Sequence, residues 1–306
     1  MTDQRLSSTM DPGDRDAVHG TVRERYAGLA LRAVGEPAGG APEGGCCGGA
    51  GCCASEPATG PGAPRSLNDP ITAELYDVDA TAAFPGAAAA SLGCGNPTAL
   101  ATLSPGQTVL DLGSGGGLDV LLSARRVAPG GRAYGLDMTP EMLGLARRHQ
   151  REAGIENAEF LLGTIDAIPL PDAAVDVVIS NCVINLAPDK DAVLAEAFRV
   201  LRPGGIFAVS DIVLLRRLPD RLRQVVGLWT GCVSGALLDV DYLDALRRAG
   251  FTEPIVDVTR TFDRADLTSL GQTTAPEEFA DRELDSLVDE LDGAFASAFV
   301  RAVKPS

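Results

Sequence analysis

Hydrophobic runs alternate with amphipathic stretches through the middle of the chain. Short apolar runs rich in β-branched residues predict strands, and apolar residues at helical spacing follow most of them. The five predicted strands are TVLDLG (108–113), RAYGLDM (132–138), AEFLLGTI (158–165), VDVVISN (175–181) and IFAVSDIV (206–213). Because strands that alternate with helices build parallel sheets, we expect an α/β fold with a doubly wound, mostly parallel sheet. Ligands of such sheets bind at the carboxyl ends of the strands.

Local signals also mark the helices between these strands. The stretch LDVLLSARRV (118–127) directly follows a glycine-rich turn. Thr139 is placed to cap the helix after the second strand, with Pro140 at its first position. The helix DKDAVLAEAFRVLR (189–202) is expected to end at the Pro-Gly-Gly turn of residues 203–205.

The two ends of the chain differ from this middle part. Residues 1–65 hold one helical stretch, AVHGTVRERYAGLALRAV (17–34), and then a Gly- and Pro-rich arm with too few apolar residues to pack. After residue 213 the alternation stops, and AFASAFVRAV (294–303) is expected to be a strand of a small C-terminal sheet. We therefore divide the chain into an N-terminal helix with a flexible arm (1–65), an α/β domain (66–213) and a smaller C-terminal α+β region (214–306).

Composition narrows the possible functions. The formal net charge of −16 argues against general nucleic-acid binding, which needs clustered Lys and Arg. We expect neither a membrane span nor secretion, because the chain has no apolar run of membrane-spanning length and its N-terminus is polar. Seven cysteines without a secretion signal indicate a reducing, cytoplasmic environment in which thiols stay free.

The turn DLGSGGG (111–117) has the chemistry of a ligand site. Its glycines allow close approach of the backbone, and the following helix offers free N–H groups. Asp137 ends the second strand and is placed to bind two ribose hydroxyls. A dinucleotide fits poorly, because Leu118 stands where a small residue is needed and Asp111 would repel a pyrophosphate. A cationic ligand with an amino-acid end, such as S-adenosylmethionine, suits Asp111 better.

With these motifs, residues 105–213 resemble the class I S-adenosylmethionine methyltransferases, which have a Rossmann-like sheet. The resemblance implies this cofactor, makes residues 66–213 the methyltransferase domain, and implies a set of cofactor-binding residues at the ends of the first four strands. They are Asp111, Gly113, Ser114 and Gly115 at the methionine end, Asp137 and Met138 at the ribose and adenine, Ile165 and Asp166 beside the ring, and Asn181 and Val183 after the fourth strand.

Three cysteines stand alone in the sequence. Cys182 directly follows the fourth strand, where it could simply be a small buried hydrophobe. Cys94, in SLGCGNPTAL, and Cys232, in WTGCVSGAL, have Gly and Pro neighbours that indicate loops able to converge with it. Three thiolates are a soft-ligand set suited to a thiophilic centre, for which zinc would want a fourth ligand. Trivalent arsenic takes three sulfurs and keeps a lone pair that can attack a methyl group.

Bases for another nucleophile are scarce, since the chain has two histidines. His149 is expected on a solvated helix surface, and His19 in the N-terminal tail. The segment after the fourth strand also lacks the Pro-Pro-aromatic sequence that methyltransferases of planar amines use. An arsenic lone pair needs no base, because no proton has to leave.

Residues 91–303 are similar to the arsenite methyltransferases. The similarity lies in SLGCGNPTAL, VLDLGSGGG, YGLDMTPEML, SNCVINLAPDKDAVLAEAFRVLRPGG, GCVSGAL and SAFVRAVKP. It implies that Cys182 and Cys232 bind arsenic(III), and that Cys94 completes the catalytic site or forms a transient disulfide. The substrate would be arsenite or its thiol conjugates, methylated by in-line displacement in arsenic detoxification, with thioredoxin or glutathione restoring the thiols. Residues 214–306 would then be the arsenic-binding region.

The chain departs from this family pattern at two places. A tyrosine that some members carry two residues before the first cysteine is Leu92 here, and we expect Tyr26 to pack its helix rather than replace that tyrosine. The arm carries two cysteine pairs, Cys46, Cys47, Cys52 and Cys53. They could capture arsenic, pair with Cys94 or form a dispensable metal-scavenging tail, and we favour the first two.

Two other functions stay open on the sequence. One is a class I methyltransferase that acts on carbon, oxygen or sulfur of a small organic molecule. The other is a metalloid- or zinc-binding protein that has lost catalysis, although the intact acidic and glycine positions argue against it.

Overall fold

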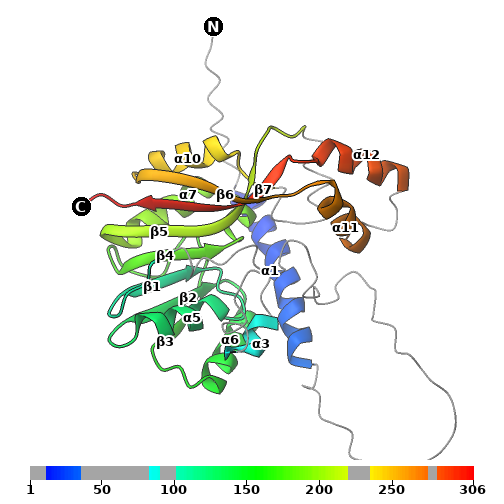
Figure 1. Ribbon diagram of the computed structural model, residues 1–306. Helices are drawn as coiled ribbons and strands as arrows, with labels where there is room; N and C mark the ends of the chain where they lie inside the picture. Colours follow the sequence, from blue (N-terminus) through cyan, green and yellow to red (C-terminus); the bar gives the residue numbers. More distant parts are fainter. Residues whose placement is uncertain (1–11, 36–82, 90–100, 220–234, 275–280) are drawn as a thin grey trace, which may run out of the picture.

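A seven-stranded sheet organises the chain in the computed structural model, which describes residues 12–35, 83–89, 101–219, 235–274 and 281–306 (Figure 1). The strand order is β3-β2-β1-β4-β5-β7-β6. The strands are β1 (Thr108–Leu112), β2 (Arg132–Asp137), β3 (Ala158–Leu162), β4 (Val175–Asn181), β5 (Leu201–Leu214), β6 (Thr252–Thr261) and β7 (Phe295–Val303). Strands β1 to β5 are parallel, as predicted from the alternation of strands and helices. Strand β3 ends earlier than predicted, and β5 begins earlier and includes the Pro-Gly-Gly turn.

The expectation of a separate C-terminal sheet was wrong. Strand β7 pairs antiparallel with β5 along its whole length, from Ile206↔Val303 to Leu214↔Phe295, and β6 pairs with its other side. The weak alternation of β7 has a physical reason: the strand lies inside the sheet and is mostly buried on both faces, so apolar side chains predominate on both, with Arg301 the exposed exception. Strands β6 and β7 therefore extend the main sheet, while the division of the chain at residues 65 and 213 stays a prediction.

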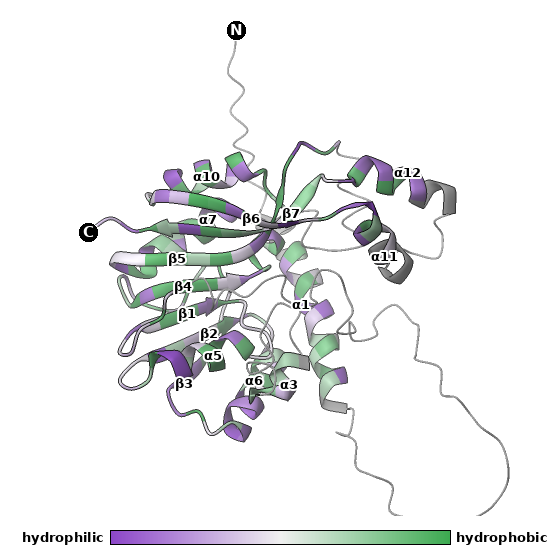
Figure 2. Ribbon diagram, in the orientation of Figure 1, coloured by the Kyte–Doolittle hydropathy of each residue, from purple (hydrophilic) through white to green (hydrophobic). Residues whose placement is uncertain are grey.

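Helices cover both faces of the sheet. Helices α5 (Leu118–Val127) and α6 (Pro140–Glu152) pack on one face with α3 (Pro85–Ala89), in a cluster that includes Phe84 and Phe160. Helices α7 (Lys190–Val200) and α10 (Asp239–Arg248) cover the other face, around Leu110 and Phe207. Figure 2 shows that β4 and β5 are largely hydrophobic along their length, as strands covered on both faces require.

The remaining helices lie outside these two layers. Helices α11 (Arg264–Thr274) and α12 (Asp281–Leu291) follow β6, and the short 3-10 helix η1 (Ile184–Leu186) follows β4. Helix α1 (Pro12–Gly35) confirms the helix predicted in the N-terminal segment, and it lies beside α6 near the carboxyl ends of the parallel strands (Figure 1). None of the described helices is long and apolar enough to cross a membrane.

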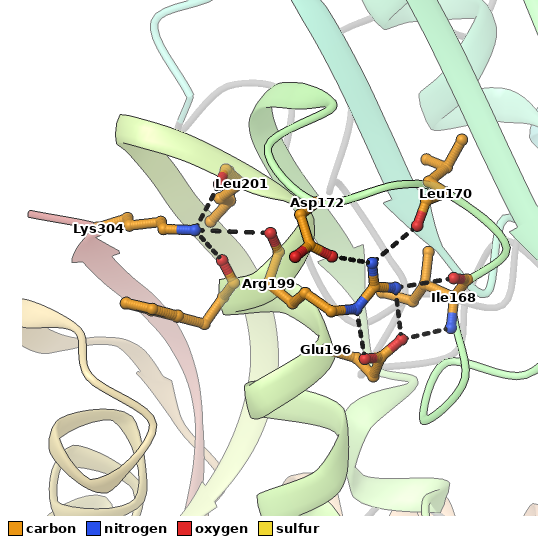
Figure 3. Close-up of polar contacts among 8 residues, drawn as sticks. Ile168, Leu170, Asp172, Glu196, Arg199, Leu201 and Lys304 are labelled. Atoms are coloured by element: carbon orange, nitrogen blue, oxygen red, sulfur yellow. Dashed lines mark hydrogen bonds and ion pairs between the residues drawn. The ribbon is translucent and has the colours of Figure 1, made fainter. Parts of the chain in front are cut away.

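A polar cluster fastens the loop between β3 and β4 to α7 (Figure 3). The guanidinium of Arg199 donates hydrogen bonds to the carbonyl oxygens of Ile168 and Leu170 and to the carboxylate of Glu196. Glu196 also accepts the Ile168 N–H at 2.8 Å, and its hydrogen bonds to Arg199 lower its pKa. Lys304 caps the carbonyl oxygens at the end of the same helix, so the loop and the C-terminus are held by one helix.

Candidate active site

A pocket lies at the carboxyl ends of β1, β2 and β4, where a parallel sheet of this topology binds its ligands. Turns that follow four different strands line it, and α1 closes one side. The sequence-predicted residues that line the pocket are Asp111, Gly113, Ser114, Gly115, Asp137, Met138, Ile165, Asn181, Cys182 and Val183. Residues far apart in the sequence thus meet at one surface, as the topology requires.

The glycine turn packs against the segment that follows β4. Gly113 has a φ of 71°, and a Cβ at this position would lie 2.5 Å from the side chain of Val183. The N–H groups of Gly113 and Ser114 donate to the carbonyl oxygen of Leu136 at 2.8 and 2.9 Å, which fixes the turn against the end of β2. Only glycine satisfies both the backbone conformation and the close contact at position 113.

Three carboxylates give the pocket an excess of negative charge. Asp111 is buried, and burial together with the charges of Asp119 and Asp137 holds its pKa well above the usual range. Burial also raises the pKa of Asp137, against hydrogen bonds from the N–H groups of Thr139 and Gly115. Buried carboxylates that repel one another are stabilised by a nearby cation. The pocket therefore suits a positively charged ligand.

Asp119 is a pocket residue that the sequence analysis missed. It lies in the first turn of α5, is buried and accepts a hydrogen bond from Nδ2 of Asn181 at 3.3 Å. An acidic residue in the first turn of a helix is common, because it interacts favourably with the helix dipole. Its position in the sequence therefore gave no sign of a ligand site, and only its burial beside Asp111 does.

The structure corrects three expectations about aromatic and imidazole side chains. His19 and Tyr26 project from α1 into the lining of the pocket, although we expected a tail and a purely packing role. His149 is buried rather than solvated, with Nδ1 2.8 Å from the carbonyl oxygen of Gly116. In each case the helix packs its polar residue against the glycine turn or the pocket, a tertiary contact that periodicity does not reveal.

Asp166 differs from the other predicted cofactor residues, because it is not among those that line the pocket. Its Oδ2 lies 3.7 Å from Nε2 of His19, so it connects the loop after β3 to α1. Thr139, predicted to cap α6, does occupy the N-cap position, but its side chain makes no capping hydrogen bond.

Cys182 lies at the edge of the pocket next to the carboxylates. It is 3% exposed and has a φ of 58°, a left-handed conformation that is uncommon for a residue with a Cβ. Its N–H donates to the carbonyl oxygen of Ser210 at 2.8 Å, which holds this conformation in place. Strained backbone of this kind is concentrated at functional sites. Cys182 is therefore buried, as a small hydrophobic residue would be, and it also lies at the pocket.

Cys182 is also disulfide-bonded. The other cysteines singled out in the sequence, Cys46, Cys47, Cys52, Cys53, Cys94 and Cys232, all lie outside the described residues. Their convergence on Cys182 therefore stays a prediction. Within the described ranges, no group of three or more His, Cys, Asp or Glu side chains is arranged to hold a metal ion.

Comparisons with known proteins agree with this geometry. Residues 103–265 match the sequence profile of a family described as "Methyltransferase domain". An arsenite methyltransferase of Halobacterium salinarum is 44% identical over 245 residues, which are 78% of this chain and 58% of the relative. One from Aquipseudomonas alcaligenes is 44% identical over 169 residues, which are 53% of this chain and 48% of the relative. The chain thus spans about half the length of the curated relatives it matches.

A solved structure extends the likeness to the fold. An arsenic(III) S-adenosylmethionine methyltransferase from Chlamydomonas reinhardtii is 34% identical, with a TM-score of 0.58, over 75% of this chain and 71% of that chain. A phosphoethanolamine N-methyltransferase from Haemonchus contortus, at 19% identity and a TM-score of 0.52, shares the fold alone. From its sequence, its mostly parallel sheet and its acidic pocket, this chain belongs to the S-adenosylmethionine-dependent methyltransferases, within the arsenic(III) methyltransferase family.

Proposed function

We propose that this protein methylates trivalent arsenic, using S-adenosylmethionine as the methyl donor. The observation that carries the proposal is that Cys182, the buried carboxylates Asp111 and Asp119, and the half-buried carboxylate Asp137 line the same pocket. A soft sulfur ligand thus lies beside a site suited to a cation. This is the combination that thiolate-bound arsenic and a sulfonium donor need.

The residues present fit the cofactor. S-adenosylmethionine, when bound, supplies a methyl group made electrophilic by its sulfonium, and its amino group adds a second positive charge. Asp111 and Asp119 would offset these charges, while the turn of Gly113, Ser114 and Gly115 would border the methionine end. Asp137 has both oxygens oriented by backbone N–H groups and would accept hydrogen bonds from the ribose hydroxyls. Met138, Ile165, Asn181 and Val183 would border the rest of the molecule. Asp166 does not line the pocket, and its place beside the ring stays a prediction.

The proposed substrate is arsenite or its thiol conjugate. Cys182 would be one sulfur ligand, and we propose Cys232 and Cys94 as the others. Three sulfurs leave a lone pair on arsenic, which would attack the methyl carbon in line with the bond that breaks. No proton leaves the nucleophile in this step, so no general base is required.

The thiols would have to be reduced before arsenic binds. Cys182 takes part in a disulfide, which occupies the sulfur that the substrate needs. We propose thioredoxin or glutathione as the reductant, in a reducing compartment such as the cytoplasm. The four cysteines of the arm, Cys46, Cys47, Cys52 and Cys53, are proposed to capture arsenic or to pair with Cys94.

The decisive experiment incubates the full-length protein with arsenite, S-adenosylmethionine and a thiol reductant, and then separates the arsenic species. We expect methylated arsenic in step with formation of S-adenosylhomocysteine. If no methylated arsenic forms under reducing conditions, the proposal is wrong, and a methyltransferase of a small organic molecule or a metalloid-binding protein would remain.

A matched pair of variants separates the two halves of the site. Cys182→Ser should abolish arsenite methylation while the affinity for S-adenosylmethionine stays within about twofold. Asp111→Asn should weaken cofactor binding at least tenfold while arsenic(III) still binds to the reduced protein. Calorimetry with the cofactor and arsenic analysis after gel filtration measure the two affinities separately.

A further inference from the structure

A buried polar cluster under η1 does not line the pocket. Nδ2 of Asn185 donates to Oδ1 of Asp211 at 2.7 Å and to the carbonyl oxygen of Ile212 at 2.8 Å. The same Oδ1 accepts the Ile212 N–H at 3.0 Å, and Oδ2 lies 3.5 Å from the hydroxyl of Tyr242. All three polar side chains are buried, at 3% exposure or less. The cluster joins η1, β5 and α10 inside the protein.

Burying the carboxyl group of Asp211 costs folding free energy. Burial raises the pKa of Asp211 to about 7, while Lys190 of α7, the Tyr242 hydroxyl, the Asn185 amide and the Ile212 N–H act in the opposite direction. Burial and the charge of Asp211 also hold the pKa of Tyr242 well above its usual range. An apolar side chain would fill the same space without desolvating a carboxyl group. A role in holding Asn185 accounts for the presence of a carboxyl group here.

Asn185 connects this cluster to Cys182. It follows Cys182 by three residues and lies within η1. The Cys182 N–H donates to the carbonyl oxygen of Ser210, the residue before Asp211. Two hydrogen bonds thus tie the segment that begins at Cys182 to consecutive residues of β5, one at each end. The left-handed backbone of Cys182 is held between these two points.

Asn185 also meets the chain that follows Cys232. A Cβ at Gly235 would lie 2.0 Å from the carbonyl oxygen of Asn185, so the two backbones are in direct contact. Gly235 is three residues after Cys232 in the sequence. The N–H of Leu214, at the end of β5, donates to the carbonyl oxygen of Leu237 and holds the returning chain in place. The segment that begins at Cys182 and the segment that begins at Gly235 therefore meet at Asn185.

We propose that Asp211, acting through Asn185, is a positioning residue that sets the Cys182 segment and the Gly235 segment in the register that arsenic(III) binding requires. The proposal rests on the proposed function, because it assigns the alignment of thiols and not the chemistry of methyl transfer. Asp211 touches neither substrate nor cofactor in this role. It is therefore expected to affect arsenic binding and to leave cofactor binding unchanged.

The test compares Asp211→Ala, Asn185→Ala, Asp211→Asn and Tyr242→Phe in the full-length, reduced enzyme. Asp211→Ala and Asn185→Ala should raise the KM for arsenite at least tenfold, with the KM for S-adenosylmethionine within twofold. Asp211→Asn keeps a carbonyl oxygen that accepts the Asn185 amide and the Ile212 N–H, so it should return the arsenite KM to within about threefold of wild type. Tyr242→Phe is the matched control, because Tyr242 contacts only the other oxygen of Asp211, and it should stay within twofold.

The possible outcomes separate this inference from the proposed function. Equal increases in the KM for arsenite and the KM for S-adenosylmethionine would overturn the inference, and so would an unchanged arsenite KM in Asp211→Ala and Asn185→Ala. The proposed function would still stand in either case if the wild-type enzyme methylates arsenite. A Tyr242→Phe variant as defective as Asp211→Ala would also overturn it. If the alanine variants do not fold, Asp211→Ser and Asn185→Ser give the same comparison. A wild type that neither binds nor methylates arsenite overturns both proposals together.

Discussion

The carboxylate of Asp137 accepts the N–H of Gly115 at 2.9 Å, so the end of β2 holds the glycine turn that follows β1. The other carboxylate oxygen accepts the Thr139 N–H at 2.8 Å, at the start of α6. These two hydrogen bonds hold the glycine turn and the start of α6 in place, and they also fix the Asp137 carboxylate before any ligand binds. The cofactor would find its ribose-binding carboxylate already in place, without an additional cost for ordering it.

This double role predicts a large effect of Asp137→Ala on cofactor affinity. The variant loses charge-assisted hydrogen bonds worth about 1.5–3 kcal/mol each, so we expect S-adenosylmethionine to bind at least tenfold more weakly. Asp137→Asn keeps one carbonyl oxygen and should bind with intermediate affinity. Isothermal titration calorimetry measures both, with Glu159→Gln on the exposed side of β3 as the control. An affinity for Asp137→Ala equal to that of the control would remove Asp137 from the site.

The contact between Gly113 and Val183 predicts a clash that can be isolated. Gly113→Ala combines a positive φ with a Cβ at 2.5 Å from Val183, whereas Gly154→Ala has a similar φ of 63° and no atom within 4 Å. The control should lose about 1–2 kcal/mol of unfolding free energy from backbone strain alone. Gly113→Ala should lose about 1–3 kcal/mol more through overpacking. Urea unfolding of both variants and of Gly113→Ala with Val183→Ala measures the difference, and the double variant should recover part of it.

Asp211 predicts a specific dependence of stability on pH. Its folded pKa of about 7 is above the unfolded value of about 3.9, so its stabilising contribution is fully present below about pH 4 and is lost as pH rises through about 7. Asp211→Asn cannot titrate, so its unfolding free energy relative to wild type should rise between these values, by roughly 4 kcal/mol at most. Above about pH 8 the difference should level off. Denaturant unfolding from pH 4 to pH 9 tests this, and a flat difference would show that Asp211 does not titrate in that range.

The disulfide of Cys182 predicts that arsenic binding depends on reduction. Protein isolated without reductant should bind less arsenic(III) than protein treated with a phosphine, because the sulfur of Cys182 is occupied. Thiol titration and arsenic analysis after gel filtration should rise together on reduction. Cys182→Ser should show a smaller rise than wild type. Equal arsenic binding by oxidised and reduced protein would contradict the proposed role of this thiol.

The local pattern of the sequence was sufficient to predict the strands that lie between helices in the core. Strand β4 runs from Val175 to Asn181, as its apolar run predicts, and Cys182 follows it at the edge of the pocket. The glycine turn and Asp137 also meet there, because strands of a parallel sheet bring their carboxyl ends to one edge. Period, turn residues and topology are properties of neighbouring residues, so they can be read along the chain.

Only the tertiary structure decided which polar residues are buried together. Asp119 resembles any acidic residue at a helix N-terminus, and His19 resembles part of a tail, until packing brings both to the pocket. Asp211 and Asn185 are separated by 26 residues in the sequence and become partners only because η1 folds over β5. Such contacts depend on which surfaces the whole chain buries. A local sequence pattern does not predict them, because burial is a property of the assembled fold. The sequence by itself determined the sheet edge and the chemistry offered there, whereas long-range packing determined the charge of the pocket and the cluster beneath Cys182.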